Sequence, residues 1–151
     1  MRITKDNIHK FIKGTSVDCI DIGVTKIDYI PEGITHLYLG SNKLTELPKL
    51  PDGITRLYCH NNKLTKLPNL PYSLTELHCY DNELTSLPKL PNNLEYLYCS
   101  DNKLTSLPKL PESLSSLYSW NNNLHYEVTI DNIKEHNKLI RRKQILSRIC
   151  V

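Results

Sequence analysis

The segment Ile54-Thr-Arg-Leu-Tyr-Cys-His-Asn-Asn-Lys-Leu-Thr-Lys-Leu-Pro-Asn-Leu-Pro-Tyr-Ser73 is one copy of a 20-residue unit that dominates this 151-residue chain. Leucine or isoleucine stands at positions 1, 4, 11, 14 and 17 of each complete copy, and asparagine stands at position 9. A unit this short cannot bury its own apolar side chains, so its copies must stack into a solenoid with a continuous core. The copies begin at Ile34, Ile54, Leu74, Leu94 and Leu114, and the fifth breaks off after Leu124.

Each unit divides into a strand and an extended return. In the segment from Arg56 to His60, apolar and polar side chains alternate with the period of two that is typical of a strand, which directs Leu57 and Cys59 inward. The return path, Leu47 to Pro51 in the first copy, contains two prolines that fix φ and remove hydrogen-bond donors. We therefore expect parallel strands on one side of the solenoid and a polyproline-like chain on the other.

This pattern resembles the leucine-rich repeat, in the short class that occurs in secreted bacterial effector proteins and in repeat proteins of giant DNA viruses. The resemblance covers residues 34–124. It implies an α/β leucine-rich-repeat solenoid with a curved parallel sheet on the concave face, an extended convex face and short helical caps at both ends. It also implies an intracellular protein-binding module, whose partner is a host protein if the chain is a viral protein or an effector.

The asparagines and cysteines of the repeat are interpreted as structural. An asparagine side chain offers both a donor and an acceptor, so the ladder at position 9 can satisfy backbone groups where the strand turns. Cys59, Cys79 and Cys99 occupy an inward position and are expected to pack as small apolar groups. With Cys19 and Cys150 the count is five, without paired Cys-x-x-Cys spacing, which argues against a secreted disulfide framework and favours a reducing compartment.

The regions outside the repeats are expected to cap the solenoid. Residues 1–33 are assigned to an N-terminal cap and a degenerate first repeat, with a helix from Thr4 to Lys13 that Thr4 caps and Gly14 ends. Residues 125–151 are assigned to a basic helix that begins near Asp131 and covers the Trp120 end of the solenoid. Its apolar positions are Ile133, Leu139, Ile140, Ile145, Leu146 and Ile149.

The outward strand positions predict where a partner binds, because the concave face of a repeat solenoid is left uncovered. Tyrosine, tryptophan and arginine, which are common in binding hot spots, are frequent at these positions. The alternative is that neighbouring rings only stack on one another along the repeats. The candidate partner-binding residues are Arg56, Tyr58, His60, Glu76, His78, Tyr80, Tyr96, Tyr98, Tyr118 and Trp120.

Two alternative functions stay open. The last 21 residues hold six basic and two acidic side chains, which would suit nucleic acid or an anionic membrane surface, although a cap helix with a solvated basic face explains them better. The second alternative function is a purely structural role in a larger assembly. No nucleophile and base stand at a convincing spacing, so we expect no enzyme, cofactor, metal site or small-molecule substrate. No signal peptide or membrane span is expected, and we expect a monomer.

Overall fold

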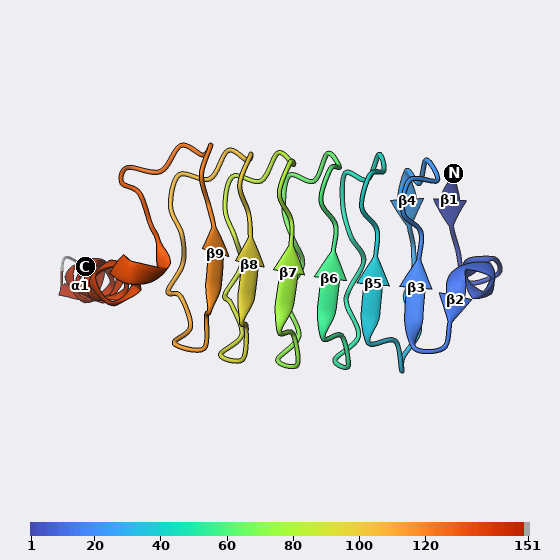
Figure 1. The fold of residues 1–151 in the computed structure, drawn as a ribbon, viewed down its shortest axis with the longest axis horizontal. Helices are drawn as coiled ribbons and strands as arrows, with labels where there is room; N and C mark the ends of the chain where they lie inside the picture. The colour runs from blue at the N-terminus through green and yellow to red at the C-terminus, as the bar shows by residue number, and fades with distance from the viewer. Residues whose placement is uncertain (150–151) are drawn as a thin grey trace.

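The computed structural model describes residues 1–149 and shows a row of short parallel strands with one α-helix at the end of the row (Figure 1). The elements are β1 (Arg2–Ile3), η1 (Ile8–Phe11), β2 (Ile12–Lys13), β3 (Ser16–Asp18), β4 (Lys26–Ile27), β5 (His36–Tyr38), β6 (Arg56–Tyr58), β7 (Glu76–His78), β8 (Tyr96–Tyr98), β9 (Ser116–Tyr118), η2 (Ile130–Asn132) and α1 (Ile133–Ile149). Seven strands form one sheet in the order β2-β3-β5-β6-β7-β8-β9, and all neighbours from β3 onward are parallel. The predicted stack of repeats is confirmed.

The register between neighbouring strands equals the repeat period. Leu37 is the Cα partner of Leu57, Leu57 of Leu77, and Leu77 of Leu97. These four side chains are fully buried, while the residues on either side of each are at least partly exposed. The leucines therefore point into the core from every repeat, as the alternation of the sequence predicts.

The return paths are extended and form the second layer. The segment from Leu47 to Pro51 contains no helix, and Leu50 is only 3% exposed. The first return contributes β4, which pairs in parallel with β1 to form a separate two-stranded sheet. The core thus lies between the seven-stranded sheet and these extended segments.

Asparagine side chains link each repeat to the previous one. Asn82 Oδ1 accepts a hydrogen bond from the backbone N–H of Leu64 at 2.9 Å, and Nδ2 donates to the carbonyl oxygens of Cys59 and Cys79 at 3.0 and 3.2 Å. The same pattern is made by Asn42, Asn62, Asn102 and Asn122. The ladder satisfies backbone groups that the turn would otherwise leave unpaired in the interior, which confirms its predicted structural role.

The cysteine column is apolar packing. Cys59, Cys79 and Cys99 are fully buried free thiols, as is Cys19 at the same position of the first turn of the solenoid. Burial raises the pKa of Cys59 and of Cys99 to about 12, and it raises that of Cys79 well above the usual value, because a thiolate would be desolvated there. The prediction of packed thiols is confirmed for these residues, whereas Cys150 lies outside the described residues.

The prediction of an N-terminal helix from Thr4 to Lys13 is wrong, because the helical segment is much shorter. Only a single 3-10 turn, η1, is helical, and its N-cap is Asn7. The chain then enters β2, which pairs antiparallel with β3 through a two-residue turn in which Gly14 has φ 61°. Gly14 therefore makes a hairpin turn rather than a helix end, and β2 covers the first edge of the sheet.

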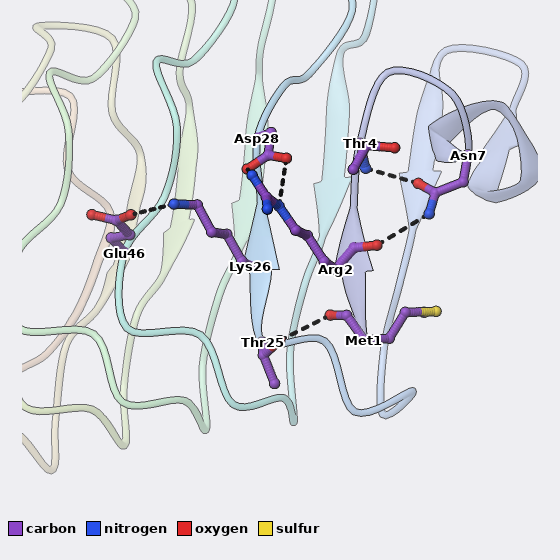
Figure 2. A network of polar contacts seen from close by, with 8 residues as sticks. All are labelled: Met1, Arg2, Thr4, Asn7, Thr25, Lys26, Asp28 and Glu46. Atoms are coloured by element: carbon purple, nitrogen blue, oxygen red, sulfur yellow. Dashed lines mark hydrogen bonds and ion pairs between the residues drawn. The ribbon is translucent and has the colours of Figure 1, made fainter.

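Polar contacts fix this end of the chain onto the first return path. Arg2 forms a bidentate contact with the carboxylate of Asp28, at 2.7 and 3.1 Å, and the Thr25 hydroxyl donates to Met1 O at 3.2 Å (Figure 2). Asn7 accepts from the backbone N–H of Thr4 and donates to the carbonyl of Arg2. These bonds lie at the surface, so they position the first strand more than they stabilise it.

The C-terminal helix caps the last end of the solenoid, as predicted (Figure 1), although Trp120 itself is 60% exposed. α1 is attached to the last return path, where Asn137 bonds both the N–H and the carbonyl of Leu110 at 2.8 Å. Ile133 is buried at the start of the helix. The helix is thus anchored through its first turns.

The predicted apolar packing is wrong for three positions further along the helix. Leu139, Ile145 and Leu146 are 40%, 47% and 60% exposed, respectively. The side chain of Ile149 lies outside the described residues.

Within residues 1–149, no helix is long and apolar enough to span a membrane.

Candidate interaction surface

The outward side of the seven-stranded sheet, here called the open face, carries a continuous row of aromatic rings. Strand register places one ring per repeat side by side. Ring centroids lie 5.1 Å apart between Tyr38 and Tyr58, and 4.9 Å apart between Tyr98 and Tyr118. His78 stands between the two pairs, at 4.3 Å from Tyr58 and 4.4 Å from Tyr98, with its ring edge-on to both. In Figure 1, α1 lies beyond β9 and crosses none of these strands.

A polar network accompanies the row on β6 and β7. Glu76 accepts from His78 Nε2 at 2.8 Å through one oxygen, and its other oxygen lies 3.3 Å from Arg56 Nε. Burial lowers the pKa of His78, and this outweighs the opposing hydrogen bond and charge of Glu76. His78 is therefore neutral near pH 7. Burial together with the hydrogen bond to Glu76 raises the pKa of Tyr58 to about 12, so its hydroxyl stays protonated.

The ring of His60 packs against a neighbouring ring and is not fully available to a partner. Its ring stacks on Tyr80 with centroids 4.7 Å apart, and its Nδ1 is buried without a hydrogen-bond partner among the described residues. Burial lowers the pKa of His60, with the nearby charge of Asp81 acting in the opposite direction. A neutral, stacked ring of this kind is better placed to support the neighbouring side chains than to transfer protons.

A groove of about 520 Å³ opens on the half of the open face nearest α1. It is lined by Tyr80, Asp81, Tyr98, Ser100, Asp101, Tyr118 and Trp120. Ser100 is a small residue between the rings of Tyr80 and Trp120 at the equivalent positions of the adjacent repeats, and it is only 4% exposed. The hollow is thus a gap in the ring pattern with aromatic walls.

The structure divides the sequence-predicted residues into two groups. Arg56, Tyr58, Glu76 and His78 form the polar network, and Tyr80, Tyr98, Tyr118 and Trp120 line the groove. His60 stacks on Tyr80 without lining the groove, and Tyr96, 39% exposed, belongs to neither group. Whether they bind a partner stays a prediction.

Sequence reasoning missed three groove residues as site candidates, namely Asp81, Ser100 and Asp101. The signal was present: among the five repeats, only these two adjacent copies have aspartate at this turn, where the other three have Ser41, Asn61 and Asn121.

No metal centre is formed by the described side chains. Within residues 1–149, no three histidine, cysteine, aspartate or glutamate residues gather closely enough to hold an ion. The arrangement offers stacking surface, hydrogen-bond groups and charge, which are the means of recognition.

The similarities to known proteins agree with this architecture. Residues 72–112 match the family model described as leucine-rich repeats in two copies. The solved structure of YopM from Yersinia enterocolitica WA-314 is similar, with a TM-score of 0.73 and 35% sequence identity over 76% of this chain.

This chain spans about a quarter of the YopM chain, 26% of its length. No curated protein matches the sequence significantly. The resemblance to repeat proteins of giant DNA viruses stays a prediction. The match to the repeat model and the likeness to YopM show that this protein has the leucine-rich-repeat fold.

Proposed function

We propose that the protein is a non-enzymatic binding module that recognises a protein partner through its open face. The observation that supports this most is the unbroken aromatic row on an uncovered parallel sheet. Parallel sheets are normally covered on both faces, and exposed rings on a rigid scaffold lose little entropy on binding. Seven strands spaced about 4.8 Å apart span roughly 29 Å, enough for a footprint of about 800 Å² on this side.

We infer further that the protein works in a reducing environment, inside a cell, where a host protein is the partner if the chain is viral or an effector. Four free, buried thiols support this compartment. In an oxidising compartment, cysteines of small domains are usually paired.

Affinity measured against the captured partner tests the proposed surface. The partner is isolated from the native cell with the full chain as bait, and its Kd is measured for wild type and for Tyr80→Ala/Tyr98→Ala. Removing two central rings should weaken binding by at least about 30-fold, the effect of losing one strong hot spot. Tyr72→Ala is the matched control, because Tyr72 is 71% exposed and lies on the return path.

The outcome that contradicts the proposal is equally direct. Equal affinities of wild type and of the folded double variant would remove the open face from the function. Circular dichroism and urea unfolding of both variants show whether the fold is kept.

A second candidate is contact with nucleic acid or an anionic surface through α1. Its six basic side chains are all exposed, and a groove of about 1030 Å³ between the helix and the last return path includes Lys109, Lys134 and Arg141. Binding of a 20-base-pair duplex, or of vesicles with anionic lipid, should then fall steeply with salt. Arg141→Gln/Arg142→Gln/Lys143→Gln should flatten that slope, and a salt-independent signal would exclude this function. The purely structural role in an assembly stays a prediction.

A further inference from the structure

The groove around Ser100 differs from the rest of the open face in the charge at its edge. Asp81 and Asp101 stand on adjacent turns, and none of the residues that line the groove is basic. Within the described residues, neither carboxylate forms an ion pair, whereas Glu76, Glu83 and Asp28 are each paired with a lysine or arginine. Two neighbouring negative charges are therefore left without a cation at the edge of this groove.

The backbone does not require aspartate at these turns. Asp81 and Asp101 have φ of 54° and 53°, in the left-handed region. Ser41, Asn61 and Asn121 hold the same conformation at 52–56° with neutral side chains. Asparagine tolerates this region as well as aspartate does. Asp101 Oδ1 accepts a hydrogen bond from Asn121 Nδ2, which the oxygen of an asparagine could also accept, so the fold does not require either negative charge.

An unused hydroxyl lies at the floor of the same groove. Ser100 is 96% buried by residue area, being 4% exposed, and it lines the groove. Its hydroxyl takes part in none of the side-chain hydrogen bonds formed by residues 1–149. Among the described residues, only His60 Nδ1 is a fully buried side-chain polar atom without a partner, so the Ser100 hydroxyl can be reached from the groove and is free to bond to an occupant.

The walls favour a cation over other occupants. Trp120 and Tyr118 both line the groove and are 60% and 51% exposed, so much of their ring surface is available to an occupant. The negative face of an aromatic ring attracts ammonium and guanidinium groups. Carboxylates accept hydrogen bonds but donate none when ionised, and a planar guanidinium offers five donors and a stacking plane.

We propose that this groove receives the cationic side chain of an arginine from a basic segment of the protein partner, with the guanidinium stacked on Trp120 and Tyr118 and paired with Asp81 and Asp101. The proposal rests on the proposed function, because it names the chemistry that the open face selects. Asp81 and Asp101 follow adjacent strands, which lie about 4.8 Å apart, so a single guanidinium can lie between the two carboxylates.

The single tryptophan of the chain makes the test direct. Trp120 is at the edge of the groove, so its fluorescence reports occupancy without a label. The full chain is titrated with the peptide acetyl-Gly-Arg-Gly-Arg-Gly-amide and with the same peptide carrying citrulline, which keeps the shape and removes the charge. We expect a saturable change with the arginine peptide and at least tenfold weaker binding of the citrulline peptide.

Two variants locate the site. Asp81→Asn/Asp101→Asn should weaken binding of the arginine peptide at least tenfold, and Ser100→Tyr should abolish it by filling the hollow. The control Asp21→Asn/Asp52→Asn removes the same net charge away from the groove, and Asp21 has the same turn conformation, with φ 51°. It should change affinity less than twofold. Urea unfolding monitored by far-ultraviolet circular dichroism shows that each variant is folded.

Several results would overturn the proposal. These are equal binding of the citrulline peptide, equal binding by the folded Asp81→Asn/Asp101→Asn variant, or saturable binding of an uncharged oligosaccharide such as cellotetraose without binding of the arginine peptide.

The two proposals fail separately. If Tyr80→Ala/Tyr98→Ala loses the captured partner while the aspartate variant keeps it, the arginine site is wrong and the binding surface stands. If the arginine peptide needs both aspartates but the partner ignores every change on the open face, the groove is a cation site and the proposed function is wrong.

Discussion

The ring of His60 lies where a side chain on Gly40 would be. A Cβ added at Gly40 would stand 2.5 Å from both Cε1 and Nε2 of the imidazole. Gly40 and His60 occupy equivalent positions in consecutive repeats, so the absence of a side chain at Gly40 leaves space for the His60 ring of the next repeat. That ring in turn stacks on Tyr80, which lines the groove.

Gly40→Ala should therefore destabilise the fold through overpacking, by about 1–3 kcal/mol. The methyl group would displace the ring of His60, and with it Tyr80. Urea unfolding measures the loss, and Gly40→Ala/His60→Ala is the matched test, since removal of the ring should cancel most of the effect of the added methyl group. A loss that is the same with and without the imidazole would contradict this account.

Asn82→Ala should cost about 2–4 kcal/mol, because it leaves the buried N–H of Leu64 and two buried carbonyls without partners. Asn69→Ala is the control, since Asn69 is exposed on a return path and should change the free energy of unfolding by less than about 0.5 kcal/mol. Both values come from urea denaturation at pH 7. Similar losses for the two variants would mean that the ladder does not stabilise the fold.

The repetitive part of the fold could be predicted from sequence because the period ties each residue to a direction. Leu57 and Asn82 recur in every copy, so their burial and their backbone contacts follow from stacking alone. The ends have no such constraint. Gly14 suits both a helix end and a hairpin turn, and only the need to cover the edge of β3 favours the hairpin.

The attachment of α1 at the C-terminal end was likewise not predictable from the sequence pattern. Its apolar pattern predicted a buried stripe, but two polar residues, His136 and Asn137, attach it to the solenoid.

The groove could not be predicted from the repeat pattern either. It forms where the small side chain of Ser100 interrupts the row of rings, and the pattern indicates which side chains point outward but not how much space lies between them.

The thiol column predicts a loss of stability at alkaline pH. The folded-state pKa of each column thiol is raised above its ordinary value of 9.0, so below pH 9 both the folded and the unfolded chain keep the proton. Above pH 9 only the unfolded chain releases it, and the free energy of unfolding falls by about 1.4 kcal/mol per pH unit for each thiol. The loss continues up to the folded-state pKa, about 12 for Cys59 and Cys99.

Cys79→Ala isolates one thiol of the column. From pH 8 to pH 10 its free energy of unfolding should fall by about 1.4 kcal/mol less than that of wild type, because one ionisation has been removed. Urea titrations at the two pH values measure both differences. An identical fall in the two proteins would show that Cys79 ionises as readily in the folded chain as in the unfolded one.

The attachment of α1 should depend on His136 far more than on the length of the helix. His136 is 2% exposed, with Nε2 at 2.9 Å from the carbonyl oxygen of Pro108 and Nδ1 at 2.7 Å from the hydroxyl of Tyr126. His136→Ala empties this site and leaves both partners unpaired, which should cost about 2–4 kcal/mol in urea denaturation. Deleting residues 143–151 removes only exposed side chains among those that are described, so it should cost less than about 0.5 kcal/mol. A larger loss from the deletion than from His136→Ala would mean that the far half of α1 packs on the solenoid, which would contradict the exposure of Ile145 and Leu146.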